Sequence, residues 1–281
     1  MNSYGRWFSG VVCAGALVLG ACGGSSDFSS AVPPKATLAR VLNATSAAKT
    51  ARVSMRVSVV GGPTASAGAF DLDATGAIDM QRQDSELTTR ATVAGRSVAI
   101  PERVVDGVVY MQLPAGIPGI TKPWVSVDTR NGFGASAQGF GQSQSDPTKF
   151  LSALAGVSDD VAEVGHEPVR GVDTTHYRAT VDMGKALASP NVPAGLRDRL
   201  KTLAPQFGNA KLPVEVWVDS DGRARKELVT VKIADLVGAA ASAAGDTAVQ
   251  VELELWDFGT AVSIAAPPAD QVQSLSSALH G

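Results

Sequence analysis

Cysteine is the residue type in this chain whose position most directly predicts a chemical reaction. The sequence contains two cysteines, Cys13 and Cys22, and Cys22 directly follows Leu19, Gly20 and Ala21. In bacteria, a cysteine preceded by a branched apolar residue and two small residues receives a lipid on its sulfur, and a peptidase then cuts the chain before it. The small side chains leave room for the peptidase beside the cut. We therefore predict that the Cys22 thiol is acylated.

The segment before Cys22 has the layout of a secretory signal peptide. Arg6 supplies a positive charge near the amino end, and Val11–Ala21 is an uncharged run of apolar and small residues. This run is too short to cross a bilayer, which takes about 20 apolar residues in a helix. We predict a signal peptide over residues 1–21, then the lipidated cysteine and a flexible tether over residues 22–34. The alternative is an ordinary signal peptide in which Cys22 is incidental.

Composition limits the partners that the mature chain could bind. Of the 24 lysines and arginines only Arg6 is lost with the signal peptide, which leaves 23 basic against 27 acidic residues and a net charge of −4. The sequence has no basic tract, so neither nucleic acid nor anionic lipid head groups are expected to bind by charge. With Cys13 removed and Cys22 acylated, no disulfide can form. The roughly 260 remaining residues must therefore be stabilised by their core alone.

The other residues that could support catalysis or metal binding do not form a recognisable site. His166 and His176 have no cysteine near them and no HExxH pattern, so a zinc site is not expected. Asp219-Ser220-Asp221-Gly222 is similar to the start of a calcium loop, but its glycine comes too early and a ligating Glu is missing, so a hairpin turn explains it better. No Gly-x-Ser-x-Gly occurs. We predict no enzyme activity, no metal and no cofactor, although distant acidic residues could still converge in the fold.

The elements that would position a binding site are mostly strands. Lys35–Thr50 has apolar residues at helical spacing and predicts an amphipathic helix. After it, apolar and polar residues alternate in short segments separated by Gly, Pro and Asp, which predicts half-buried antiparallel strands. The predicted strand segments are Val53–Val59, Phe70–Asp73, Ile78–Met80, Leu87–Val93, Val104–Val105, Val108–Leu113, Trp124–Val127, Val161–His166, His176–Asp182, Pro213–Asp219, Leu228–Ile233, Val249–Leu255 and Val262–Ile264.

The segments between the strands predict one long loop and three further helices. Thr129–Asp146 has no periodicity and is rich in Gly, Ser and Gln; a loop of this length is usually functional or disordered. Helices are predicted at Asp146–Gly156, at Lys185–Gly208 with proline interruptions, and at Asp270–Leu279. Together these elements predict an α+β fold in which one curved antiparallel sheet of about ten strands has helices packed on its concave face. We expect residues 35–281 to form a single domain.

Five short segments are notable for their order along the chain. They are Val104–Tyr110 with Lys122-Pro123-Trp124, Asp146-Pro147 with Leu151 and Leu154, Gly171–Tyr177, Leu212–Asp219, and Trp256–Gly259 with Val262 and Pro267. In this order after a lipidation signal, they resemble the LppX, LprA, LprF and LprG lipoprotein family of mycobacteria and other actinobacteria, over roughly Lys35 to Asp270. The resemblance implies a β half-barrel over helices, related to the LolA and LolB carriers, with an apolar cavity that takes acyl chains. It also implies a protein anchored through Cys22, by acyl groups such as palmitate, at the outer face of the plasma membrane.

In this family the shape of the cavity and its apolar lining hold the lipid, so no binding residues can be transferred one by one. The candidate residues therefore come from the alternating apolar positions of this chain. The candidate lining residues are Val57, Phe70, Leu72, Val93, Val109, Met111, Leu154, Leu200, Leu203, Val216, Val218, Val231, Val251 and Leu253. The competing interpretation is that these side chains form a packed core.

Two functions follow from these observations. The leading hypothesis is an envelope lipoprotein that binds an acylated lipid or lipoglycan in an apolar cavity and carries or presents it, with an envelope transporter as a further candidate partner. The alternative is a structural or interaction lipoprotein of the surface, which binds another envelope protein through an exposed apolar patch on a filled domain.

Cys22→Ala is expected to release the protein from membranes or to stall its export, because the thiol that receives the lipid is gone. Cell fractionation followed by intact mass spectrometry would measure both the location and the acyl mass. If the variant stays with the membranes and the wild-type mass shows no acylation, Cys22 is not the anchor.

Overall fold

The structure, a computed structural model, describes residues 34–62, 71–93, 96–128, 160–182, 184–185, 211–234 and 245–280. The predicted signal peptide, tether and Thr129–Asp146 loop lie outside these residues. So do the helix predicted at Asp146–Gly156 and nearly all of the helix predicted at Lys185–Gly208.

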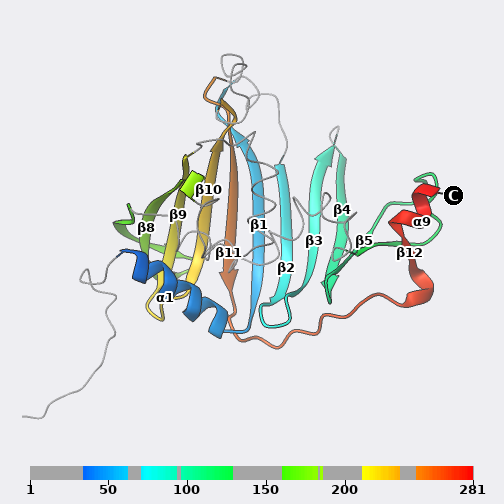
Figure 1. Cartoon of the computed structure of the whole chain (residues 1–281), viewed down its shortest axis with the longest axis horizontal. Helices are drawn as coiled ribbons and strands as arrows, with labels where there is room; N and C mark the ends of the chain where they lie inside the picture. Colours follow the sequence, from blue (N-terminus) through cyan, green and yellow to red (C-terminus); the bar gives the residue numbers. More distant parts are fainter. Residues whose placement is uncertain are drawn as a thin grey trace, which may run out of the picture.

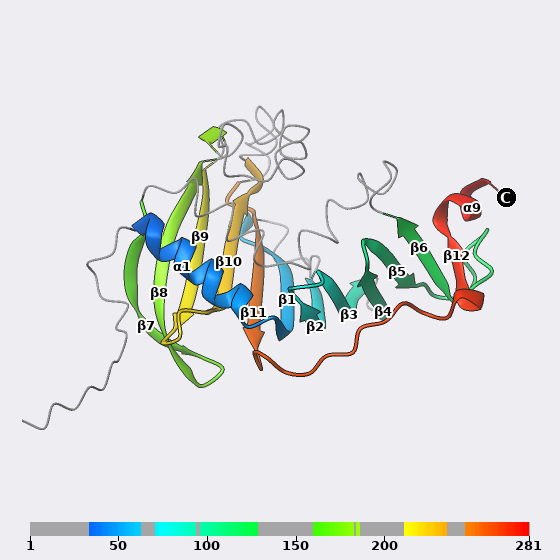
Figure 2. The same cartoon turned by 60° about the horizontal axis from the view of Figure 1, so that its bottom comes forward.

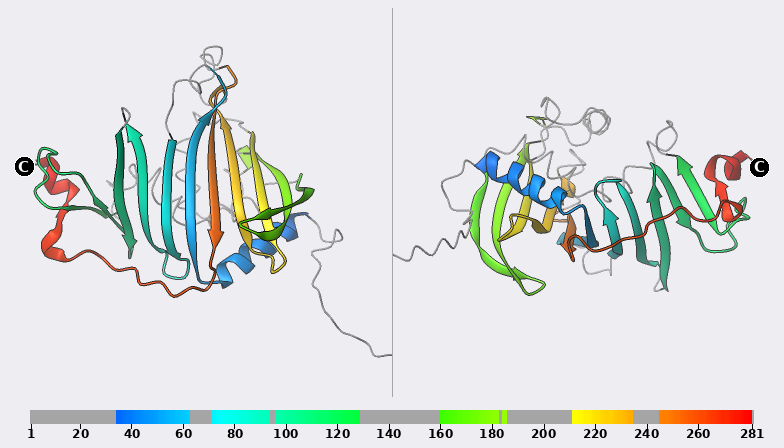
Figure 3. Two further views of the ribbon diagram at one scale, coloured as in Figure 1. Left: turned by 180° about the vertical axis from the view of Figure 1, so that it is seen from behind. Right: turned by 90° about the horizontal axis from the view of Figure 1, so that it is seen from below.

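The described strands form one open, curved sheet of twelve strands in the order β12-β6-β5-β4-β3-β2-β1-β11-β10-β9-β8-β7 (Figures 1 and 3). All neighbours are antiparallel except β12 and β6, which are parallel. The strands are β1 (Thr50–Val60), β2 (Asp71–Asp79), β3 (Asp84–Val93), β4 (Arg96–Val105), β5 (Val108–Gln112), β6 (Trp124–Asp128), β7 (Ala162–Val169), β8 (Val172–Asp182), β9 (Lys211–Asp219), β10 (Ala224–Lys232), β11 (Ala248–Trp256) and β12 (Val272–Ser274).

β1 lies at the centre of the sheet and shows why the alternating pattern forms strands. Its apolar residues are buried in alternation with exposed or half-buried polar ones, as a sheet with one buried face requires. β1 pairs with β2 on one side and with β11 on the other, although β11 is nearly 200 residues away in sequence. The buried cluster around it comprises Ala51, Val53, Met55, Val57, Ala74, Ile78, Leu87, Leu253 and Leu255.

Two tight turns fix the register of the outer hairpins. Asp106 and Gly107 join β4 to β5 with positive φ angles of 50° and 76°, and Arg170 and Gly171 join β7 to β8 with the same two values. Two successive residues with positive φ form the type of turn whose twist matches antiparallel strands. Asp84 holds the first turn in place, since its buried carboxylate accepts a hydrogen bond of 3.1 Å from the backbone N–H of Asp106. Both turns lie between strand segments that the alternating pattern predicted.

Helix α1 (Pro34–Ala47) lies across β8, β9 and β10 near one end of the strands (Figure 2). Val41 and Thr45 are fully buried. The Thr45 hydroxyl donates to the Val41 carbonyl at 2.7 Å and accepts a 3.0 Å hydrogen bond from the backbone N–H of Ala224, at the start of β10. α1 is therefore attached to the sheet at the turn between β9 and β10.

Three parts of the predicted architecture need correction. The sheet has twelve strands where about ten were expected. Val262–Ile264 was expected to be a strand, but this part of the chain runs along the end of the sheet outside any strand, where Arg82 and Arg103 each donate to a backbone carbonyl, of Ile264 and Ala265, at 3.3 Å (Figure 1). The helix expected at Asp270–Leu279 is divided into η2 (Ala269–Gln271), β12 and α9 (Leu275–His280), because Val272–Ser274 pairs with the edge strand β6.

The prediction of helices packed on the concave face is not confirmed by the described helices. α1 crosses one end of the sheet, and α9 lies at the opposite edge beside β6 and β12 (Figure 2). The fold of the described residues is mostly β, with few helices.

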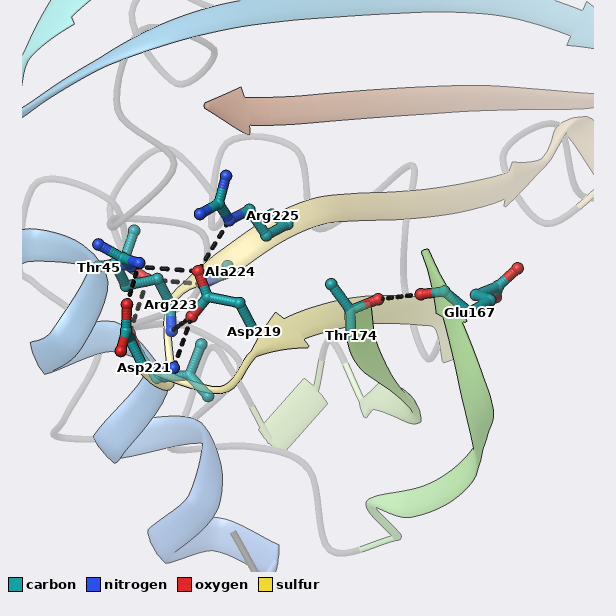
Figure 4. A network of polar contacts seen from close by, with 9 residues as sticks. Thr45, Glu167, Thr174, Asp219, Asp221, Arg223, Ala224 and Arg225 are labelled. Atoms are coloured by element: carbon teal, nitrogen blue, oxygen red, sulfur yellow. Dashed lines mark hydrogen bonds and ion pairs between the residues drawn. The ribbon is translucent and has the colours of Figure 1, made fainter. Parts of the chain in front are cut away.

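Asp219 organises the hairpin turn to which α1 is attached (Figure 4). The residue is 3% exposed, and its carboxylate accepts hydrogen bonds from the backbone N–H groups of Asp221 (3.1 Å) and Arg223 (2.9 Å). The same carboxylate also accepts hydrogen bonds from Nε of Arg223 (3.1 Å) and Nε of Arg225 (2.8 Å). The hairpin turn predicted for Asp219-Ser220-Asp221-Gly222 is confirmed, and the carboxylate is occupied by the two guanidinium groups and the turn itself.

Asp219→Ala is expected to lower the free energy of unfolding by about 2–4 kcal/mol, because it leaves two guanidinium groups and two N–H groups without their acceptor. Urea denaturation would measure the loss. Asp221→Ala is the matched control, since the Asp221 side chain is 66% exposed and its removal should cost less than about 0.5 kcal/mol. Equal losses in the two variants would contradict a structural role for the Asp219 carboxylate.

Candidate functional site: the apolar face of the sheet

Cross-strand register gathers the apolar side chains on one side of the sheet, which we call the apolar face. One row of directly paired residues comprises, from β2 to β8, Leu72, Val57, Val251, Val229, Val214 and Ala179. Because side chains alternate along a strand, the residues two positions before and after each of these share the same face. The row therefore defines an apolar surface that crosses six neighbouring strands.

The apolar face continues onto the other half of the sheet. A second row comprises, from β6 to β1, Val125, Met111, Glu102, Leu87, Gly76 and Val53. A Cβ atom added to Gly76 would lie 1.9 Å from the carbonyl oxygen of Glu86, so only glycine fits where β2 and β3 approach each other.

Nine of the fourteen candidate lining residues lie on this face. Those buried are Val57, Val109, Val216, Val218 and Leu253, and those half-buried are Leu72, Met111, Val231 and Val251. The remaining five are outside what the structure describes, namely Phe70, Leu154, Leu200, Leu203 and the side chain of Val93. Cys22, the predicted lipidation site, is outside it as well.

Large aromatic side chains are on the opposite face, which we call the polar face. Trp124, Trp217 and Trp256 are paired with Gln112, His176 and Arg52 respectively, all at polar-face positions. Among the described strand residues, Tyr177 is the aromatic one on the apolar face, where burial and the charge of Glu163 raise the pKa of its hydroxyl. The apolar face is therefore built mainly from Val, Leu, Ala and Met.

Ion pairs and ring contacts cover the polar face. Arg56 and Asp73 are 2.9 Å apart, and Lys226 and Glu252 are 2.7 Å apart. Arg170 lies 3.8 Å from the ring centre of Trp256. The two ion pairs connect neighbouring strands. Arg170 instead joins the turn between β7 and β8 to β11, although β9 and β10 lie between β8 and β11 in the sheet.

His176 is at the centre of a separate group on the polar face. Its ring stacks on Trp217 at 4.1 Å, with Nδ1 3.1 Å from Glu167 Oε1 and Nε2 2.6 Å from Glu215 Oε2. The indole N–H of Trp217 donates to the same oxygen of Glu167 at 2.5 Å. These contacts attach the edge strand β7, which carries Glu167, to β8 and β9. The two ring nitrogens face different carboxylates, so the three side chains do not converge on one point where a metal could bind.

Glu102 and Glu227 lie among apolar residues of the apolar face, although alternation of apolar residues did not predict either of them. Glu102 pairs with Leu87 and Met111, and Glu227, which is 3% exposed, pairs with Leu253 and Val216. Burial raises the pKa of the Glu102 carboxyl above its usual value. Alternation could have revealed Glu102, because it follows Ile100 and precedes Val104 at a spacing of two.

The arrangement can bury hydrocarbon against Val, Leu and Ala side chains and can offer a polar contact at an acidic side chain. None of the helices in the described ranges is long and apolar enough to cross a membrane.

Comparison with known proteins identifies relatives of this chain. A 31.2 kDa Streptomyces griseus protein described as uncharacterized is 37% identical over 78 residues, which are 27% of this chain and a quarter (25%) of that protein. Among solved structures, the Mycobacterium tuberculosis lipoprotein LppX shares 16% identity with a TM-score of 0.47, over 83% of this chain and 98% of LppX. LprF from Mycobacterium bovis shares 17% identity with a TM-score of 0.46, over 83% of this chain and 96% of LprF.

The family model of the LppX_LprAFG lipoproteins matches residues 33–264, which include α1 and every strand except β12. Since this match spans most of the chain, the protein belongs to the LppX_LprAFG lipoprotein family.

Proposed function

We propose that this lipoprotein binds an acylated lipid or lipoglycan against the apolar face of its sheet and carries or presents it at the cell envelope. The observation that carries the proposal is the apolar face itself, which continues across strands on both sides of β1 while the three described tryptophans lie on the polar face. Membership of a lipoprotein family supports an envelope protein. In this proposal residues 1–21 direct export, acylated Cys22 holds the protein at the outer face of the plasma membrane, and residues 35–281 form the binding domain.

The dimensions of the apolar face suit an acyl chain. Neighbouring strands are about 4.8 Å apart, so the six-strand row from Leu72 to Ala179 spans about 24 Å along the sheet. One leaflet of a bilayer has hydrocarbon about 15 Å deep. Each methylene group moved from water onto this surface would contribute about 0.8 kcal/mol, so a single long chain could supply most of the affinity.

The side chains of the apolar face also suit a cavity. Valine and alanine occupy much of the row from Leu72 to Ala179, and glycine stands at position 76, so little volume projects from the centre of the sheet. These small side chains leave the volume above the sheet to whatever packs on it, which in this proposal is the acyl chain. The fourteen candidate residues are proposed as part of the cavity lining, and a transporter of the envelope as the partner that delivers or receives the lipid.

The Val251→Phe substitution distinguishes between two interpretations of the apolar face, a lipid cavity and a packed core. In a cavity the larger ring occupies space that the lipid uses, so retained lipid should fall several-fold while the free energy of unfolding changes by less than about 1 kcal/mol. In a packed core the same change should cost about 1–3 kcal/mol. Gln250→Phe is the matched control, because Gln250 is the neighbouring residue on the polar face of β11.

The measurement is native mass spectrometry of the full-length lipoprotein, purified from an actinobacterial host, together with extraction into organic solvent. Solvent-extractable acylated species distinguish a bound lipid from the covalent anchor. A wild-type protein that carries no such species and takes none up, or a Val251→Phe variant that is destabilised with its lipid content unchanged, would contradict the proposal. The first result would favour binding to another envelope protein.

A further inference from the structure

Glu102 is a carboxylate placed among apolar side chains on the proposed lipid-binding face. Its directly paired neighbours are Leu87 on β3 and Met111 on β5, and Ile100 and Val104 precede and follow it on the same face of β4. Leu87 is 7% and Val104 2% exposed, so the carboxylate stands beside residues that are almost completely dry.

The protein provides no cation for this group within the part of the chain that the structure describes. No hydrogen bond or ion pair reaches its carboxylate there, and desolvation alone raises its pKa. The adjacent Arg103 belongs to the polar face, where its guanidinium is 2.8 Å from Glu86 and 5.2 Å from the ring centre of Trp124. Glu102 is half-buried, and its carboxylate therefore loses hydration without a compensating contact from the described residues.

Two buried acids of the sheet, Asp84 and Asp219, have charged partners. Asp84 is paired with Arg82 and with the N–H of Asp106, and Asp219 is paired with Arg223 and Arg225. Both lie at the ends of strands and hold turns. Glu102 lies inside β4 and does not hold a turn. A carboxylate that stabilises no element of the fold, yet faces the ligand surface, is expected to contribute to binding.

We propose that Glu102 selects the ligand, by accepting a hydrogen bond from an uncharged hydroxyl group located beside the acyl chains, such as a glycerol or sugar hydroxyl. This inference rests on the proposed function, since the hydroxyl belongs to the lipid. A hydroxyl satisfies the carboxylate without bringing a second ion into apolar surroundings, whereas an ammonium group would have to be desolvated and an anionic group would be repelled. The ligand is therefore a hydroxyl-bearing lipid rather than a free fatty acid.

The test uses two probes that differ by one hydrogen-bond donor. Full-length protein, anchored in phosphatidylcholine vesicles, is offered a 1,2-diacylglycerol with a photoreactive diazirine in one acyl chain, or the same molecule with its hydroxyl acetylated. The concentration that gives half-maximal crosslinking reports the affinity. Wild-type protein should prefer the hydroxyl-bearing probe by about tenfold or more, the size expected for a hydrogen bond to a charged acceptor.

Three variants assign this preference to Glu102. Glu102→Leu should abolish the preference and keep the affinity for the acetylated probe within about twofold, since leucine leaves an apolar surface. Glu102→Gln should retain part of the preference, because its amide oxygen still accepts a hydrogen bond. Glu86→Gln is the control, since Glu86 pairs with Arg103 on the polar face, and it should leave the preference unchanged.

The outcomes separate this inference from the function on which it rests. Wild-type protein that binds both probes equally, or a Glu102→Leu variant that keeps the preference, overturns the role of Glu102 and leaves lipid binding in place. Wild-type protein that binds neither probe overturns the proposed function, and the inference with it.

Stability of the lipid-free protein gives a second, independent readout. Because burial raises the pKa of Glu102 in the folded state, the folded protein holds this proton more tightly than the unfolded chain does, and the contribution of Glu102 to stability falls as pH rises through that pKa. Arg96 occupies a position six residues earlier on the same face of β4, where its backbone is about 20 Å from that of Glu102. Apart from it, the described residues on this face of β3, β4 and β5 include no other ionisable side chain. Glu102→Gln should therefore have a higher urea midpoint than wild type at about pH 7, with the difference shrinking toward about pH 4. A variant less stable than wild type at about pH 7 would show that the carboxylate has a structural partner and would overturn the proposal.

Discussion

The two-residue period of the β-strand is the constraint on which the rest of the structure depends. Once Val53, Met55 and Val57 of β1 take one face, the register with β2 and β11 determines the face of every neighbouring residue outward through the sheet. A slip of one residue in any pair would move that strand's valines into water and its charged residues into the apolar surface. The register therefore determines the apolar face and the polar face together, and a change in one face would change the other.

Contacts between side chains on the polar face help to fix the register of the strands. Its cross-strand partners carry opposite charges or a ring and a cation, as in Arg56 with Asp73 and Lys226 with Trp217. Each such pair contributes modestly by itself, and a shift in register would separate its partners. Placing these contacts and the bulky indoles on the polar face leaves the apolar face free of requirements other than hydrophobicity. That division suits a surface whose partner is hydrocarbon, because hydrocarbon imposes no directional contacts.

The sequence predicted the strands and their buried face well and the edges of the sheet poorly. Alternation is a local signal, so it located β1, β9 and β11 and placed nine candidate residues on one face. β12 has only three residues, and whether Val272–Ser274 forms a strand or continues a helix is decided by the free edge of β6, which no local pattern contains. Glu102 was missed for another reason. A search for apolar residues discards an acid at the position where its presence is most informative.

The placement of the acids indicates which of them serve the fold. Asp84 and Asp219 are almost completely buried, yet each has a guanidinium and at least one backbone N–H within hydrogen-bonding distance, so burial strengthens these contacts instead of opposing them. Glu102 is half-buried and has no such contact among the described residues, although its neighbours Ile100 and Val104 on that face of β4 are apolar. A leucine there would satisfy every requirement of the sheet that the structure displays. The acid is consequently explained by what the apolar face binds, and not by how the sheet is built.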